Sequence, residues 1–156
     1  MNIRKAEFRD IPQIEQLLVQ VNMVHHHGRP DLFRAGCQKY NQQQLKEILQ
    51  DEKSPVFVAT DTNDQTIGYA FCKLQQHSGD SILQDIKTLY IDDLCVDENH
   101  RGEHVGAALY QYFVDFAKKI GCYNLTLNVW SCNPSAIRFY EKCGLKPQKI
   151  GMEKIL

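Results

Sequence analysis

The chain has 156 residues, 24% of them charged, and a formal net charge of −1. This length supports one domain over residues 1–156 with its own hydrophobic core. The near-neutral charge excludes a general attraction to nucleic acid or anionic membranes, and no apolar run approaches the roughly 18 residues of a membrane-spanning helix.

The first third of the chain predicts a strand followed by two helices. The strand is expected at residues 3–6, and Asp10 is suited to cap the helix after it, with Pro12 just inside that helix. The helical pattern breaks at 24–36, which is expected to be a loop, and a second helix is expected at 41–50. The first helix repeats apolar residues at helical spacing: Ile14, Leu17, Leu18 and Val21.

The middle of the chain predicts an antiparallel meander of strands. Residues 56–60 and 66–74 form a hairpin pattern around the polar turn DTNDQ, and Gly68 marks a candidate bulge. Residues 87–96 are rich in β-branched, aromatic and apolar side chains and are expected to form the central strand.

The last third alternates helices and strands. An amphipathic helix is expected at 105–120, a strand at 125–130, a helix from Asn133-Pro134 to Gly144, and one or two edge strands at 145–156. A helical crossover implies that the strands before and after it are parallel. The predicted fold class is α/β, with a mixed, mostly antiparallel sheet flanked by helices and one parallel strand pair.

The cysteines and the consecutive histidines argue against a disulfide-linked secreted protein and against a metal site. The six cysteines are scattered without a CxxC pair and the first ten residues are charged, so we expect reduced thiols in a cytoplasmic protein. His25, His26 and His27 are consecutive and cannot all reach one ion without a contorted backbone, so no metal is expected.

The segment LYIDDLCVDENHRGEHVGA at 89–107 carries the strongest chemical signal. A strand leads into a glycine-containing turn that opens a helix, and free N–H groups at a helix N-terminus favour phosphate. The spacing lacks both the GK[ST] ending of a P-loop and GxGxxG, which argues against a nucleotide binder.

These residues resemble the GNAT superfamily of N-acetyltransferases. RGEHVGAAL after YIDDLCV looks like its acyl-coenzyme A motif, and NPSAIRFYEKCGL looks like its next motif, a helix that carries a tyrosine. The resemblance covers essentially the whole chain. It implies that the strands at 87–96 and 124–130 splay apart around acetyl-coenzyme A. It also leaves a homodimer open.

The resemblance assigns binding of acetyl-coenzyme A to three segments. Backbone groups of the central strand hold the pantetheine arm, and the glycine-containing loop holds the pyrophosphate. The last helix makes further contacts with the cofactor. The residues so assigned are Leu94, Cys95, Val96, Arg101, Gly102, Glu103, His104, Val105, Gly106, Ala107, Asn133, Ser135 and Tyr140.

The loop departs from the family pattern at His104, which stands where a glycine is usual. Glu103 beside it adds a negative charge next to the expected pyrophosphate. Histidine keeps the N–H group but adds bulk and loses the conformational freedom of glycine. Three interpretations follow: a tolerated substitution with weaker binding, a phosphate contact by protonated His104, or loss of cofactor binding.

Acetyl transfer to an amine needs a base, an oxyanion-stabilising N–H group and an acid for the leaving thiolate. The resemblance places Tyr140 as the acid and favours Asp92 as the base, with an N–H group near Cys95 or Val96 facing the oxyanion. The alternatives are a core aromatic for Tyr140 and a structural carboxylate for Asp92. In a regular strand Asp92 and Asp93 point to opposite faces, unless a bulge intervenes.

The family shapes its acceptor site with the loop between the first helices. The expected acceptor-binding residues are His27, Phe33, Asp92 and Asp93, which His25, His26, Asp31 and Tyr40 could join. The predicted function is direct transfer from acetyl-coenzyme A to a primary amine in a ternary complex. YIDDLCVDENHRG is similar to diamine acetyltransferases, and an acidic pair suits a cationic acceptor such as a polyamine or other small amine. A protein or peptide acceptor and a non-catalytic acyl-coenzyme A sensor stay open as alternatives.

Overall fold

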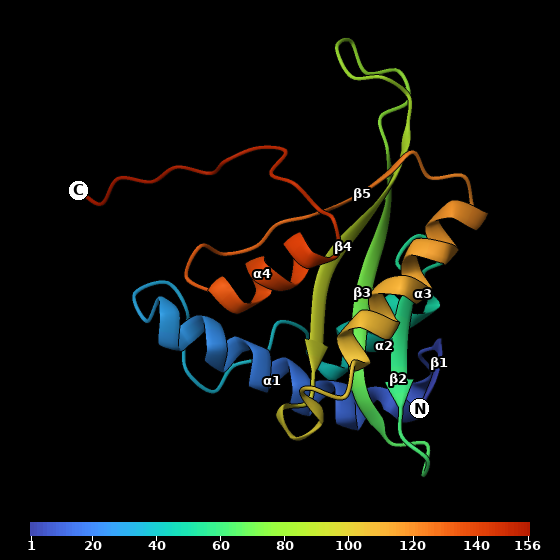
Figure 1. Cartoon of the computed structure of the whole chain (residues 1–156), viewed down its shortest axis with the longest axis vertical. Helices are drawn as coiled ribbons and strands as arrows, with labels where there is room; N and C mark the ends of the chain where they lie inside the picture. The colour runs from blue at the N-terminus through green and yellow to red at the C-terminus, as the bar shows by residue number, and fades with distance from the viewer.

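A computed structural model describes residues 1–156 and contains one five-stranded sheet and four α-helices (Figure 1). The strands are β1 (Asn2–Lys5), β2 (Val56–Thr60), β3 (Thr66–Gln76), β4 (Lys87–Val96) and β5 (Asn124–Leu127). The helices are α1 (Ile11–Gly28), α2 (Gln42–Gln50), α3 (Val105–Lys119) and α4 (Pro134–Lys142).

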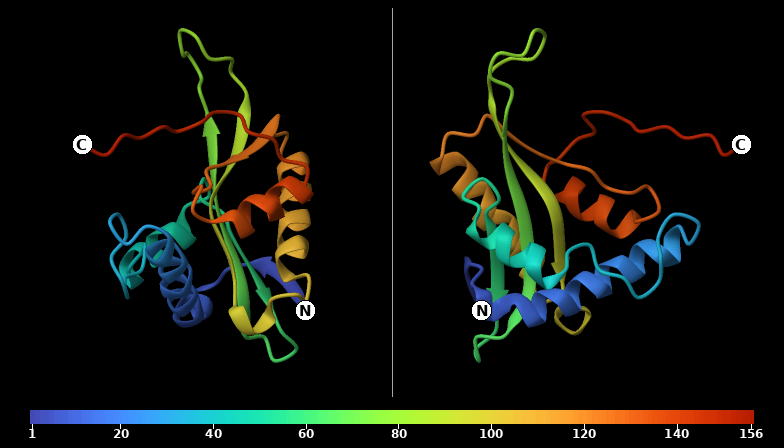
Figure 2. Two further views of the ribbon diagram at one scale, coloured as in Figure 1. Left: turned by 60° about the vertical axis from the view of Figure 1, so that its left-hand side comes forward. Right: turned by 180° about the vertical axis from the view of Figure 1, so that it is seen from behind.

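The sheet has the strand order β1-β2-β3-β4-β5. The first four strands pair antiparallel, and β5 pairs parallel to β4 after the crossover through α3. Figure 2 shows the sheet edge-on, with α1 and α2 on one face and α3 on the other. The predicted mixed sheet with helices on both faces is therefore confirmed.

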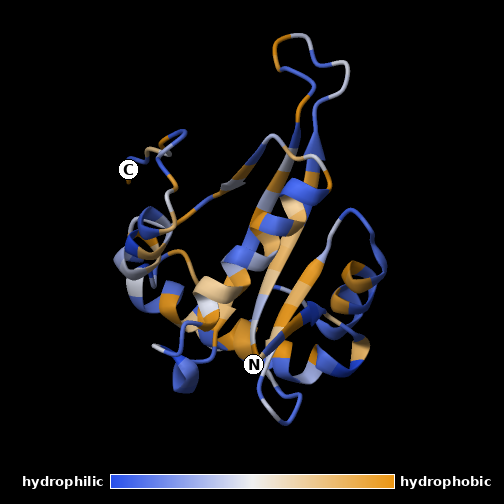
Figure 3. Cartoon of the chain, turned by 45° about the vertical axis from the view of Figure 1, so that its right-hand side comes forward, coloured by the Kyte–Doolittle hydropathy of each residue, from blue (hydrophilic) through white to orange (hydrophobic).

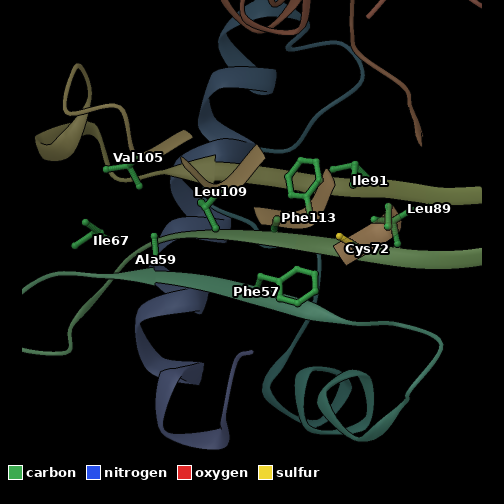
Figure 4. Close-up of a cluster of buried hydrophobic side chains, with 11 residues drawn as sticks. Phe57, Ala59, Ile67, Cys72, Leu89, Ile91, Val105, Leu109 and Phe113 are labelled. Atoms are coloured by element: carbon green, nitrogen blue, oxygen red, sulfur yellow. The ribbon is translucent and has the colours of Figure 1, made fainter. Parts of the chain in front are cut away.

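Two hydrophobic cores hold these layers together. Leu109 and Phe113 of α3 pack on Phe57, Leu89 and their neighbours on one face of the sheet (Figure 4). On the other face, α1 and α2 cover a second cluster that includes the fully buried Tyr69. Hydrophobic residues accordingly concentrate in the strands at the centre of the sheet, and hydrophilic residues in the connecting loops (Figure 3).

Asp10 connects the start of α1 to the sheet rather than capping the helix directly. Its carboxylate accepts two hydrogen bonds from Arg4, at 2.7 and 2.9 Å, and one from the Thr66 hydroxyl at 3.0 Å. The Glu7 N–H donates a further bond at 2.7 Å. A carboxylate that is only 3% exposed thus has a full set of donors, as a buried charge requires.

Three predicted boundaries are wrong. Helix α1 continues to Gly28, so the histidines are helical and do not begin a loop. Strand β5 stops at Leu127 instead of continuing to residue 130, because the chain diverges from β4 there. Residues 145–156 form no strand and run away from the sheet (Figure 1), since they have no ladder partner. No helix combines the length and apolar character needed to cross a membrane.

Candidate active site

A pocket opens where β4 and β5 separate. The two strands pair only from Thr88–Asn124 to Ile91–Leu127, and β4 then continues to Val96 without a partner on that side. A cavity of about 470 Å³ lies in the gap, a size typical of a small-ligand site. Its walls come from α1, the 29–41 connection, β4, the chain after β5, and α4.

A β-bulge places both acidic residues of β4 on this pocket. Phe71 of β3 lies opposite Asp93 and Cys72 lies opposite Ile91, so Asp92 has no partner on β3. A bulge breaks the regular alternation of side chains and redirects those next to it. Asp92 and Asp93 therefore both line the pocket, which a regular strand would not permit.

Asp92 is held by three donors. Lys39 Nζ lies 2.9 Å from Oδ2, Lys73 Nζ lies 3.2 Å from Oδ1, and the Tyr40 hydroxyl donates to Oδ2. Burial alone would raise the pKa of Asp92. Hydrogen bonds from Tyr40 and Lys39, with the charges of the two lysines, outweigh it and lower the pKa below the ordinary value. A carboxylate in this state is a weak proton acceptor.

Asp93 has the opposite environment. Its carboxylate accepts a hydrogen bond from the hydroxyl of the fully buried Tyr69 at 3.2 Å and forms no ion pair with a lysine or arginine. Burial raises the pKa of Asp93 to about 6, although the Lys39 charge and the Tyr69 bond oppose the rise. A carboxylate with this pKa is ionised at neutral pH and accepts a proton more readily than Asp92 does.

Tyr140 faces the same pocket from α4. Asn133 starts this helix, with its side chain accepting the Ala136 N–H at 3.2 Å, and both residues line the pocket. Phe139 packs edge-on against Tyr110 of α3, with ring centroids 6.4 Å apart. Burial and the nearby Asp93 charge raise the pKa of Tyr140 well above its ordinary value. The phenol therefore stays protonated at neutral pH, as a proton donor must.

The β4 residues after the acidic pair divide between the two faces of the sheet. Leu94 lines the pocket, and Leu94 and Val96 pack against the α3 core. Cys95 is buried on the α1 face, with its Sγ 3.6 Å from the Leu17 carbonyl oxygen. Burial raises the pKa of Cys95 to about 12, so the thiol is a packing residue and a poor nucleophile.

The loop before α3 is exposed and leads directly into the helix N-terminus. Arg101 to His104 are exposed, and Val105, buried against the sheet, starts the 15-residue helix. The Glu103 carboxylate lies 3.1 Å from His100 and is thus engaged inside the loop. A Cβ at Gly106 would only reach ordinary contact with Phe139, at 3.5 Å. The fold itself therefore does not require glycine there, whereas a close approach of pyrophosphate would.

Aromatic side chains form the outer wall of the pocket. Phe33 lies 5.0 Å from the His25 ring and 5.1 Å edge-on from Trp130, measured between centroids. All three line the pocket and connect α1 to the chain after β5. His25 is one of the three histidines expected at the acceptor mouth, whereas Trp130 was missing from the residues predicted from the sequence.

Several predicted site residues lie outside the pocket lining. His27 is exposed on the last turn of α1, because successive helical residues point about 100° apart and His25 takes the inward position. Ser135 and Ala107 are exposed on the first turns of their helices. Asp31 pairs with Arg29 at 2.7 Å. Tyr40 packs against Phe71 and donates its hydroxyl hydrogen bond to Asp92.

Comparison with known proteins agrees with this geometry. The sequence model of the Acetyltransferase (GNAT) family matches residues 21–145. The chain belongs to the GNAT family of acetyltransferases. This confirms the family and fold predicted from the two motifs, and it supports an acetyl-coenzyme A-dependent N-acetyltransferase as the enzyme class.

Named GNAT relatives differ in what they act on. Glucosamine 6-phosphate N-acetyltransferase of Arabidopsis thaliana is 35% identical over 44% of this chain and 44% of its own length. N-alpha-acetyltransferase 30 of Schizosaccharomyces pombe is 33% identical over 56% of this chain and 55% of its own. The chain thus spans about half the length of these relatives. The crystal structure of the BH1408 tetramutant from Bacillus halodurans is similar over 100% of both chains, at 33% identity and a TM-score of 0.95.

The unusual residue of the GNAT loop, His104, makes a testable prediction. It adopts φ 61° and ψ 15°, in the left-handed region that favours glycine. We expect His104→Gly to bind acetyl-coenzyme A about two- to tenfold more tightly, because removal of the imidazole opens the approach to the N–H groups of the loop. Relief of the left-handed strain, roughly 1–2 kcal/mol, acts on the free and the bound protein alike and so does not change the affinity. Calorimetric titration measures this, with His104→Ala as the control that removes bulk but keeps the strain. Weaker binding by the glycine variant would instead assign His104 a phosphate contact.

Proposed function

We propose that this protein transfers an acetyl group from acetyl-coenzyme A to a primary amine of a small molecule, directly within a ternary complex. The observation that carries the proposal is the placement of Asp93 and Tyr140 on one pocket in the gap between β4 and β5. Their environments differ as an acid and a base require. Asp93 has a pKa of about 6, and Tyr140 stays protonated.

In the proposed reaction Asp93 is the base and Tyr140 is the acid. Asp93 accepts a proton from the acceptor ammonium, directly or through a water, and thereby exposes the nitrogen lone pair. The nitrogen bonds to the thioester carbonyl carbon, whose oxygen gains negative charge near the unpaired edge of β4. The carbon–sulfur bond then breaks, and Tyr140 gives its proton to the departing thiolate. The Tyr140 phenolate takes back a proton from the positively charged nitrogen, which leaves a neutral amide, and Asp93 releases its proton to water. We therefore propose Asp93 as the base, in place of Asp92, which the family resemblance favours.

The residues assigned to acetyl-coenzyme A fit that substrate. The unpaired edge of β4 from Asp92 to Val96 offers backbone groups to a pantetheine arm. The N–H groups of the 101–106 loop, at the start of α3, offer a cradle for pyrophosphate. The cosubstrate supplies the activated acetyl group, and the chain orients it and moves the protons.

The outer wall favours a small acceptor over a peptide. Phe33 and Trp130 narrow the pocket between α1 and the chain after β5. A protein or peptide acceptor stays the alternative, which is the acceptor class that the name of the Schizosaccharomyces relative suggests.

Turnover tests the proposal. The purified protein is incubated with acetyl-coenzyme A and a panel of small amines and N-terminal peptides, and free thiol is measured. We expect acetylation of at least one small amine, with no peptide acetylated faster. Tight binding of acetyl-coenzyme A without turnover of any acceptor would favour the non-catalytic sensor instead.

A further inference from the structure

The two carboxylates of the pocket do not present two free negative charges. Lys39 Nζ and Lys73 Nζ lie 2.9 and 3.2 Å from the two oxygens of Asp92. The Asp92 side chain is only 9% exposed, whereas those of the lysines are 45% and 46% exposed. Two ammonium groups on one carboxylate leave this cluster with one positive charge in excess, which an ionised Asp93 balances.

No other acidic residue lines the pocket. The basic residues of the lining are Lys39 and His25. Burial and the Lys39 charge lower the pKa of His25, so it is neutral at neutral pH. Asp93 is therefore the one carboxylate that can accept an incoming ammonium group without displacing a lysine.

This charge balance separates two kinds of amine. A monoamine brings one positive charge, which Asp93 can neutralise. A diamine or polyamine brings a second ammonium group, which would meet Lys39 at the pocket wall with no free carboxylate. Water only partly screens like charges a few ångström apart at a half-exposed site, so the repulsion between the two ammonium groups still affects binding.

Building on the proposed acetyl transfer, we propose that Lys39 and Lys73 determine specificity by neutralising Asp92, so that the pocket accepts amines with a single positive charge and discriminates against polyamines. The Asp-Asp pair in the sequence suggests a polycationic acceptor. The two lysines, contributed by the 29–41 connection and by β3, reverse that expectation.

Lys39 is the better residue to change. It lines the pocket, whereas Lys73 does not, and its exposed side chain contributes little to the core. In its absence the Tyr40 hydroxyl and Lys73 still bond Asp92, so the carboxylate stays in place. Removal of Lys39 therefore changes the charge of the pocket more than its shape.

The test compares butylamine with diaminobutane, which share a carbon chain length and differ in one ammonium group. For the wild type we expect a diamine-to-monoamine ratio of kcat/KM well below two, which is the statistical factor for a diamine with two equivalent amines. Lys39→Met should raise the ratio about tenfold, because part of the Asp92 charge becomes available. Lys39→Arg keeps the charge and should keep the ratio. An unchanged ratio in Lys39→Met, or a strong diamine preference in the wild type, overturns the proposal.

Binding of the same amines, measured by calorimetry in the presence of coenzyme A, separates this inference from the proposed reaction. A tenfold gain in diamine affinity on Lys39→Met, without turnover by any variant, supports the selectivity and contradicts the reaction. Acetylation of both amines with no such gain supports the reaction and contradicts the selectivity. Failure of both amines to bind either variant overturns the selectivity.

Discussion

Asp93→Asn is expected to lower kcat/KM for an amine acceptor by about 10²- to 10⁴-fold, the usual contribution of a general base. In the wild type, kcat/KM should rise with pH through about 6, because Asp93 accepts a proton only when it is ionised. The asparagine variant keeps the size of the side chain but cannot titrate. Its residual activity should therefore lack this acid limb when kcat/KM is measured from pH 5 to 9.

Asp92→Asn is the matched control. The pKa of Asp92 is lowered by its donors, so its titration lies below the range of the assay. We expect a loss of less than about tenfold and an unchanged acid limb. If Asp92→Asn abolishes the limb and Asp93→Asn retains it, the base is Asp92, as the family resemblance suggests.

The free energy of unfolding provides a check on the Asp93→Asn variant. The folded-state pKa of Asp93 is raised from 3.8 to about 6. The stabilisation of the folded protein by the protonated Asp93 is therefore fully present below about pH 4 and is lost as pH rises to about 6. That change corresponds to about 3 kcal/mol at full burial. Asp93→Asn should therefore gain stability relative to the wild type between pH 4 and 8. Urea unfolding at both pH values measures this and shows that lost activity is not lost folding.

Tyr140→Phe is expected to lower kcat by about 10²- to 10³-fold, since the departing thiolate loses its proton donor. Phenylalanine keeps the ring that fills the pocket wall, so the affinity for acetyl-coenzyme A should change less than about threefold. Steady-state kinetics with a saturating amine measures the first value, and calorimetry measures the second.

A leaving group that needs no proton distinguishes an acid from a packing residue. When the acetyl donor is a thioester of an aromatic thiol, the leaving group departs as a stable thiolate. Tyr140→Phe should therefore lose much less activity with this donor than with acetyl-coenzyme A. Equal losses with both donors would contradict the role of acid. Full activity of Tyr140→Phe would make Tyr140 a core aromatic, which its helical spacing alone suggests.

Local patterns in the sequence predicted most of the elements correctly. Strands β2 and β4 begin and end where alternating and β-branched residues place them, and α3 and α4 start within a residue of the predicted positions. These features depend on neighbouring residues only, so periodicity and capping can reveal them. The motif around Tyr140 predicted the family for the same reason, because its residues are contiguous.

Contacts between distant segments could not be predicted in this way. The bulge at Asp92 arises from the register of β4 against β3, and register is a property of the pair of strands. The partners of Asp92 come from positions 39, 40 and 73, which no local pattern connects to it. Residues 145–156 were expected to form edge strands, but a strand forms only where a neighbour supplies its ladder, and no strand pairs with this segment.

The sequence by itself determined the GNAT family and the mixed sheet. It also predicted Tyr140 as the acid and Asp92 as the base, with Asp93 as an acceptor-binding residue, whereas we propose Asp93 as the base. Only the tertiary structure decided which aspartate is free, because a pKa depends on burial and on charges brought from other segments. Composition reveals how many charges a chain carries, whereas folding decides which of them neutralise each other. The acceptor that we expect differs from the one suggested by the Asp-Asp pair for that physical reason.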